Sequence, residues 1–401
     1  MLAATVRVTR DLDAAEEAVQ DAYVAALRAW ARDGVPARPG AWLTTAARRN
    51  ALNALARGRT LQDKLPLLLE PDDAAPHDAT ADAATAAADG AIPDDRLRLV
   101  FTCCHPALSQ EAQIALTLRL VCGVATADVA QALLVAEATM AARITRAKKK
   151  IAAASIPYAV PSAEELPARV DAVLTVIHLL YAAGHAAHSG AELVRDELTG
   201  RALDLARMLR LLLPADREVA GLLALLLVHH ARRATRTDAA GRLLRLEQQD
   251  RSAWERAPIA EADRLVLASL RGGPPGRFTL QAAIASLHAH ADSYAATDWP
   301  QILTLYDELL RIWPSPVVAL NRAVALSMVE GPAAALAEVE AIERDGRLAG
   351  YRYLPATKAE LLHRLGRDAE AVAAYRAALE LSDNAVEQEF LAERIRSSPV
   401  R

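Results

Sequence analysis

One acidic segment near the N-terminus divides this chain into separately folding parts. Residues 59–95 contain the run EPDDAAPHDATADAATAAADGAIPDD, in which Asp, Ala and Pro dominate and large apolar side chains are nearly absent. Such a segment buries too little apolar surface to offset the conformational entropy that is lost on ordering. We therefore expect a flexible acidic linker over 59–95, with small helical domains at 1–58 and 96–155 on either side of it.

The remaining sequence favours an all-α fold. Hydrophobic residues make up 53% of the 401 residues and aromatic residues only 4%, and Leu and Ala, which are strong helix formers, supply most of the apolar mass. The formal net charge of −4 gives no global attraction to nucleic acid or anionic lipid, so any such contact must be local. No secretory signal or long apolar run is present, and the 3 cysteines argue against a disulfide framework. These features predict a cytoplasmic protein with no membrane contact.

Beyond residue 155 the sequence divides into three further parts: a proline-containing hinge at 156–167, a helical extension at 168–290 and TPR-like repeats at 291–401. A period of 35 residues separates two sets of positions, which are Gly331, Leu336 and Val339, and Gly366, Ala371 and Ala374. The run LLHRLGRDAEAVAAYRAALEL at 361–381 has the Leu-Gly, Ala and Tyr spacing of a tetratricopeptide (TPR) helix pair. An ordinary helical hairpin is the alternative. Residues 168–290 repeat poorly, and they form either a divergent part of the same superhelix or a separate bundle.

The segment 123–151 gives the strongest indication of function. Thr126 is expected to cap a first helix, which has three apolar residues on one face: Val129, Ala130 and Leu133. After a break at 134–136, a second helix has an apolar stripe that consists of Met140, Ile144, Ala147 and Ile151. Two short helices joined by a tight turn, the second ending in strong positive charge, predict a helix-turn-helix.

The second of these helices is expected to bind DNA. Arg143, Arg146 and Lys150 fall at i, i+3 and i+7 and share one side of the helix. Arg suits guanine edges and phosphates, whereas Lys148, Lys149 and Lys150 would mainly hold phosphates and set the salt dependence. The alternative is a solvated surface helix with a charged tail.

Two amphipathic helices are predicted in the N-terminal domain. The helix at 13–30 has an apolar face made of Val19, Ala22, Tyr23, Ala26, Leu27 and Trp30. Its opposite face is acidic and polar and contains Glu16, Glu17, Gln20 and Asp21. The helix at 39–59 is expected to direct Trp42, Leu43 and Ala46 inward and to project four polar side chains: Arg48, Arg49, Asn50 and Asn53.

Taken together, residues 1–155 resemble the two-domain body of bacterial extracytoplasmic-function (ECF) sigma factors of the sigma-70 family. The order of an acidic-faced helix, a Trp-Leu helix ending in Arg-Arg-Asn, a linker and a helix-turn-helix carries this resemblance. Beyond residue 160 the chain is similar to the ECF group with a large C-terminal TPR-like extension. The matching segments are FTCCHPAL (101–108), QQDRSAW (248–254), LQAAIASLHA (280–289), TDWPQILTLYDEL (297–309), SPVVALNRAVAL (315–326) and LLHRLGR (361–367).

The resemblance implies three functional surfaces. The surface that faces the clamp helices of core RNA polymerase would comprise Glu16, Glu17, Gln20 and Asp21. The surface near the −10 promoter element, where one strand is melted and bases are captured, would comprise Arg48, Arg49, Asn50 and Asn53. The surface at the −35 major groove would comprise Glu137, Thr139, Arg143 and Arg146, with Lys148, Lys149 and Lys150 on phosphates.

The chain also departs from that group. Met1 falls inside the first sigma helix, so the N-terminal domain is expected to be shortened by about one helical segment. Ala141 and Ala142 occupy recognition-helix positions where relatives often have polar side chains. LLYAAGHAAHSG at 179–190 stands where the group usually has Phe-Asn-Glu-Gly-Tyr, and His230 replaces an expected Asp. A function tied to those acidic or amide groups would be altered or lost.

Neither catalysis nor a cofactor is expected. Cys103, Cys104 and His105 suggest a metal site, but adjacent side chains on a helix diverge and no second ligand pair completes a tetrahedron, so we predict packing thiols and no metal. Two histidine pairs lack a carboxylate-rich pattern and are interpreted as structural or surface residues: His229/His230 and His288/His290. No phosphate loop, dinucleotide fingerprint or nucleophile elbow occurs.

The sequence therefore predicts an all-helical sigma factor that binds core RNA polymerase and promoter DNA and directs initiation. We expect the extension to regulate this activity in cis, through TPR-like contacts with a peptide or a neighbouring domain and without a dedicated membrane anti-sigma factor. The alternative is a helix-turn-helix regulator or TPR scaffold that never joins polymerase. Such a protein would have no reason to contain the two N-terminal helices.

Overall fold

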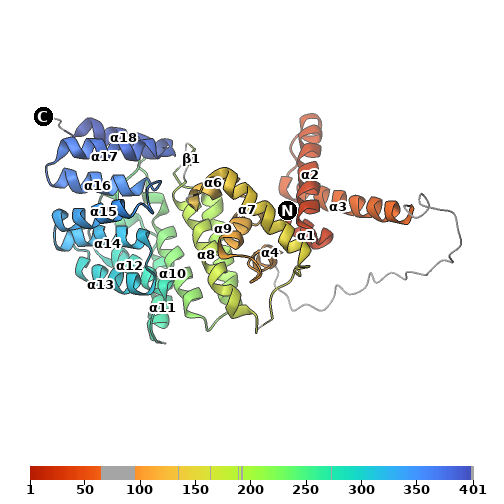
Figure 1. Cartoon of the computed structure of the whole chain (residues 1–401), viewed down its shortest axis with the longest axis horizontal. Helices are drawn as coiled ribbons and strands as arrows, with labels where there is room; N and C mark the ends of the chain where they lie inside the picture. The colour runs from red at the N-terminus through yellow and green to blue at the C-terminus, as the bar shows by residue number, and fades with distance from the viewer. Residues whose placement is uncertain are drawn as a thin grey trace. The chain divides into compact units, whose positions relative to one another are not determined.

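A computed structural model describes residues 1–64, 95–133, 135–162, 164–187, 189–190, 193–271 and 273–398 (Figure 1). The described residues form α-helices, short 3-10 turns and one two-residue parallel pair, β1 (Ser189–Gly190) with β2 (Asp383–Asn384). The predicted all-α fold class is therefore confirmed. The chain divides into two compact units, of which the first contains residues 1–124 and 141–173 and the second contains residues 125–140 and 174–401. No helix in the described ranges is long and apolar enough to cross a membrane.

The first unit begins with α1 (Leu2–Thr9), α2 (Leu12–Asp33) and α3 (Pro39–Lys64). Residues 59–64, which composition assigned to the acidic linker, continue α3 because the stretch RTLQDK contains no Gly or Pro that would end a helix. The rest of the predicted linker, apart from the first residue of the next helix, lies outside the described residues.

The buried face of α2 differs from the predicted one. The buried residues are Leu12, Ala15, Ala18, Ala22 and Ala26. Tyr23 and Leu27, which were expected to point inward, are 50% and 74% exposed. Helix α2 packs along α3. Because the two helices lie close together, the small alanine side chains fit between them and the larger side chains lie on the outside.

The rest of the first unit comes mainly from α4 (Asp95–Cys103), α5 (Gln110–Leu120), most of α7 (Glu137–Ala153) and the segment after it. The Tyr158 hydroxyl joins it to the N-terminal helices, lying 2.9 Å from the Ala3 carbonyl oxygen and 2.7 Å from that of Asp95. Cys103 and Cys104 are fully buried, and burial raises the pKa of both thiols, that of Cys104 to about 12. Both side chains are therefore neutral at physiological pH.

The predicted helix-turn-helix is formed by α6 (Thr126–Ala132) and α7 (Glu137–Ala153). All four residues of the expected apolar stripe on α7 are buried: Met140, Ile144, Ala147 and Ile151. The predicted cap is wrong by one residue, because Ala125 has an extended backbone and its carbonyl accepts the first helical bond from Val129 at 3.0 Å. Thr126 is thus the first residue of α6 and does not cap it.

The second unit contains the extension. Its first helices are α8 (Leu166–His185), whose C-terminal part belongs to it, α9 (Asp196–Leu212), α10 (Arg217–Ala231), α11 (Arg256–Arg271) and α12 (Arg277–His290). The apolar run at 222–228 is entirely buried in α10, which packs on α9, α11 and α12. Gly221 allows α10 to approach α12 closely, since a Cβ atom at this position would lie 2.6 Å from the Thr279 backbone nitrogen.

Successive helical hairpins follow. Their helices are α13 (Trp299–Ile312), α14 (Pro316–Val329), α15 (Pro332–Asp345), α16 (Tyr353–Arg364), α17 (Asp368–Glu380) and α18 (Ala385–Ser397). Gly331 joins α14 to α15 and Gly366 joins α16 to α17, with φ angles of 94° and 72° that favour glycine. The glycines that the sequence places 35 residues apart thus occupy the same turn of two consecutive hairpins. Tyr375 is buried in the core between them.

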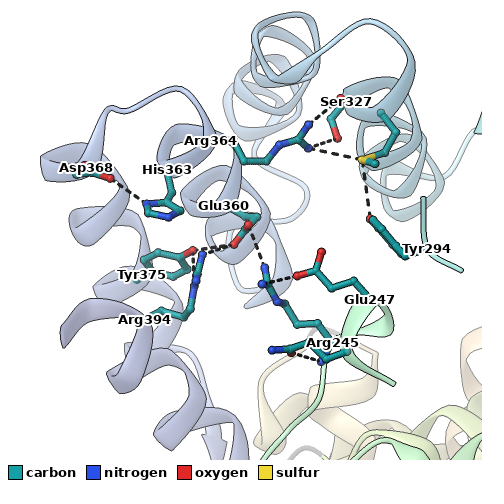
Figure 2. Close-up of polar contacts among 12 residues, drawn as sticks. Arg245, Glu247, Tyr294, Ser327, Glu360, His363, Arg364, Asp368, Tyr375 and Arg394 are labelled. Atoms are coloured by element: carbon teal, nitrogen blue, oxygen red, sulfur yellow. Dashed lines mark hydrogen bonds and ion pairs between the residues drawn. The ribbon is translucent and has the colours of Figure 1, made fainter. Parts of the chain in front are cut away.

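Polar contacts join the long connection between α10 and α11 to the last hairpins (Figure 2). Arg245 in this connection lies 3.0 Å from a carboxylate oxygen of Glu360 on α16. The same carboxylate accepts hydrogen bonds from Arg394 at 2.7 Å and from the Tyr375 hydroxyl at 3.0 Å. The hairpins therefore hold a segment of their own chain through one shared acidic group.

Candidate promoter and polymerase interface

A hollow of about 430 Å³ lies between α2 and α3 and is lined by Asp21, Asn50, Asn53, Ala56 and Arg57. It brings two residues of the predicted −10 surface next to one residue of the predicted polymerase surface. Asn50 is partly fixed, since its amide donates to the Ala18 carbonyl at 3.3 Å. Arg57 was not predicted, although its i+4 spacing from Asn53 places it on the same side of α3.

The arginines of the predicted −10 surface are accessible. Arg48 and Arg49 are both exposed on α3 and directly precede Asn50. Arg48 also lines a larger cleft of about 1530 Å³ within the first unit, together with Arg98 and Lys148. The cleft thus combines one cationic side chain of the predicted −10 surface, Arg48, with one of the predicted −35 surface, Lys148.

Lys148 connects two of the predicted surfaces directly. Its ammonium group lies 3.0 Å from a carboxylate oxygen of Asp13 and also pairs with Glu16. Although burial opposes the charge, these two carboxylates raise the pKa of Lys148. The lysine expected on promoter phosphate and the glutamate expected on polymerase therefore bind each other in this structure.

The other members of the two surfaces are more open. Glu17, Gln20 and Asp21 are exposed on α2. The exposed members on α7 are Glu137, Thr139, Arg146, Lys149 and Lys150, and Arg143 is partly exposed. The helix thus has a buried apolar stripe and an accessible cationic side.

The helix-turn-helix also contacts the extension within the second unit. Asp128 on α6 lies 3.6 Å from Arg195, the residue that precedes α9. Residues 125–140, which include all of α6 and the start of α7, belong to the same compact unit as the extension. Sequence patterns could not reveal this contact because the two residues are far apart in the chain.

A helix-turn-helix preceded by a small helical domain with an exposed cationic helix defines a DNA-binding transcription factor. Comparisons with known proteins define it further. The model of Sigma-70 region 2 matches residues 2–60, that of Sigma-70 region 4 matches residues 98–151, and a family of unknown function (DUF6596) matches residues 169–270. An uncharacterized protein of Rhizobium meliloti (strain 1021) is 44% identical over 394 residues, which cover 97% of this chain and 91% of that protein.

The chain belongs to the sigma-70 family, as an ECF-like sigma factor with a C-terminal extension. Its two sigma-70 regions give it a role in promoter recognition, with core RNA polymerase and promoter DNA as partners. Members of this family are initiation factors and not enzymes.

Proposed function

We propose that three separate surfaces of this sigma factor bind core RNA polymerase, the −10 element and the −35 element during promoter-specific initiation. The polar side of α2, which comprises Glu16, Glu17, Gln20 and Asp21, contacts core RNA polymerase. On α3, four residues hold the melted −10 strand: Arg48, Arg49, Asn50 and Asn53. The side of α7 that comprises Glu137, Thr139, Arg143 and Arg146 reads the −35 major groove, while Lys148, Lys149 and Lys150 neutralise phosphates.

The hollow between α2 and α3 is the observation that carries this assignment. It is lined by the amides of Asn50 and Asn53, which can donate to and accept from the edge of an unstacked base. Arg48 and Arg49 are exposed and directly precede Asn50. Both can hold the backbone of the same strand, Arg48 from the side of α3 that lines the larger cleft. A groove that combines cations with a hollow for bases suits single-stranded DNA.

We further propose that the extension regulates the sigma domains in cis through α6. The contact between Asp128 and Arg195 supports this role, as does the presence of residues 125–140 in the compact unit that contains the extension. A change in the extension would then alter the position or order of the helix-turn-helix.

Permanganate footprinting of promoter DNA with purified core polymerase tests the −10 assignment. The Arg48→Ala/Arg49→Ala variant is expected to bind polymerase normally but to reduce the reactivity of melted thymines at least fivefold. Arg28→Ala, which changes an exposed arginine on α2, is the matched control. Wild-type reactivity of the double variant would refute the −10 assignment.

A further inference from the structure

A cluster of basic and aromatic side chains in the second unit is not used by the proposed promoter surfaces. It consists of Tyr181 and His185 on α8, His229 on α10, and Arg232 and Arg236 just after α10. We call these five residues the basic cluster.

The aromatic members of the basic cluster lie in contact. The rings of Tyr181 and His185 stack with centroids 5.5 Å apart, and the rings of His185 and His229 are 5.3 Å apart. Arg236 donates a hydrogen bond to the backbone carbonyl of His185. Arg232 and Arg236 both act on the pKa of His185 and His229, so the two guanidinium groups lie beside these rings.

The two arginines have no carboxylate partner among the residues that the structure describes. Nearby carboxylates are engaged elsewhere, since Glu255 pairs with Arg233 and Glu387 pairs with Arg352. Arginine is rarely buried without a counter-charge, because a guanidinium removed from water needs an anion to compensate it. The interior of the extension therefore contains two partly buried guanidinium groups that form no direct ion pair within the described residues, and Glu387 acts on Arg236 only from a distance.

The protonation states follow from burial. Burial, with help from Arg236 and Arg251, lowers the pKa of Arg232 to about 10, so the side chain is still charged at neutral pH. Burial also lowers the pKa of His185 and of His229 well below the usual range, so both imidazoles are neutral. The cluster thus provides two cations and several neutral donors.

Several polar atoms in the cluster have no hydrogen-bond partner in the described part of the chain. These atoms are buried and comprise Tyr181 Oη, His185 Nδ1, His229 Nδ1 and Arg232 Nε. Buried polar atoms are almost always paired, so four unpaired atoms in one cluster are available to a polar ligand.

We propose that the basic cluster binds the phosphate group of a phosphorylated small molecule. Two guanidinium groups match the charge of a phosphate monoester, which is close to −2 at neutral pH. Their planar forks suit phosphate oxygens, and the tyrosine hydroxyl and imidazole N–H groups supply further donors. An aromatic substituent of the ligand can pack against the His185 ring, which is partly exposed and stacks on Tyr181.

Isothermal titration calorimetry of the full chain tests this proposal without polymerase or DNA. The probes are inorganic phosphate and phenyl phosphate, with chloride at matched ionic strength and malonate as a dicarboxylate. We expect about one phosphate per chain, tighter binding of phenyl phosphate, and at least tenfold weaker binding of malonate. Saturation by neither phosphate probe, or equal binding of malonate, would overturn the assignment.

Substitutions then place the ligand. Arg232→Gln is expected to weaken phosphate binding at least tenfold, whereas the control Arg233→Gln, whose arginine already has a carboxylate partner, keeps wild-type affinity. Without phosphate, Arg232→Gln is expected to unfold at the same or a higher temperature than wild type, because it removes an unbalanced cation. A purely structural role for Arg232 predicts the opposite shift and unchanged affinity.

If Arg232→Gln does not fold, the conservative variant Arg232→Lys tests the same prediction. Arg232→Lys keeps the charge but loses the guanidinium fork, so it is expected to retain the wild-type unfolding temperature and to bind phosphate at least threefold more weakly. Undiminished binding by Arg232→Lys together with tight binding by a variant that lacks the tyrosine hydroxyl, Tyr181→Phe, would place the phosphate elsewhere.

Discussion

At the residue scale, Lys148 belongs to two surfaces. Sequence patterns place it correctly in the basic end of α7, but its partners are 135 and 132 positions away, at Asp13 and Glu16. No local pattern predicts a contact of that separation, since it depends on how the helices pack. Lys149, its neighbour, is exposed, so a comparison of the two lysines isolates the contribution of the ion pair to stability.

Lys148→Ala is expected to lower the free energy of unfolding by about 0.5–1 kcal/mol, because a partly exposed ion pair contributes that much. Lys149→Ala is expected to leave stability unchanged, and each variant should reduce the salt dependence of DNA binding by about one phosphate contact. Urea denaturation and DNA titrations at several salt concentrations measure the two effects. Equal stability of the two variants would show that the ion pair does not hold the unit together.

At the scale of single helices, local periodicity predicts which residues of α7 are buried but not which residues of α2. The large apolar side chains of α7 are Met140, Ile144 and Ile151, and they recur at helical spacing. The sequence therefore leaves one choice for the buried face of this helix. Helix α2 has alanines around much of its surface, and the partner helix decides which of them face inward. Tyr23 is consequently exposed although its size suggested burial.

Close helix packing in the extension makes Gly221 a sensitive position. Gly221→Ala would place a Cβ atom 2.6 Å from backbone of Thr279, and we expect it to destabilise the protein by about 1–3 kcal/mol through overpacking. Gly200→Ala is the control: this glycine lies inside α9 with open space around it, so alanine should stabilise by about 0.5–1 kcal/mol. Thermal unfolding of both variants measures the two changes in stability. Equal changes would contradict the close packing of α10 against α12 at Gly221.

At the scale of the whole molecule, composition and motif order predict the helical fold, the two sigma regions and the hairpins, because each depends on local pattern. The division into units depends on tertiary contacts and was not predicted: α6 and the start of α7 belong with the extension, while the rest of α7 belongs with the N-terminal helices. The basic cluster was not predicted for the same reason, since its residues come from two helices and the segment after them, and His229 was interpreted only as a structural or surface residue.

Coupling between the extension and the helix-turn-helix is testable by charge reversal. Arg195→Asp is expected to change run-off transcription by at least threefold, and adding Asp128→Arg is expected to restore at least half of the lost difference by reversing the ion pair. Arg201→Asp, whose partly exposed arginine pairs with Glu197 in the same helix, is the control. Failure of the second substitution to restore activity would argue that Arg195 acts through other contacts.

Promoter-specific transcription is the most direct test of the central claim. Purified core RNA polymerase is incubated with a promoter library, with and without the full chain, and the 5′ ends of the transcripts are mapped. The account predicts new start sites that share one −10 and one −35 sequence and that disappear with the Arg48→Ala/Arg49→Ala variant. Transcripts that are identical with and without the chain, together with no association between the chain and polymerase, would contradict it.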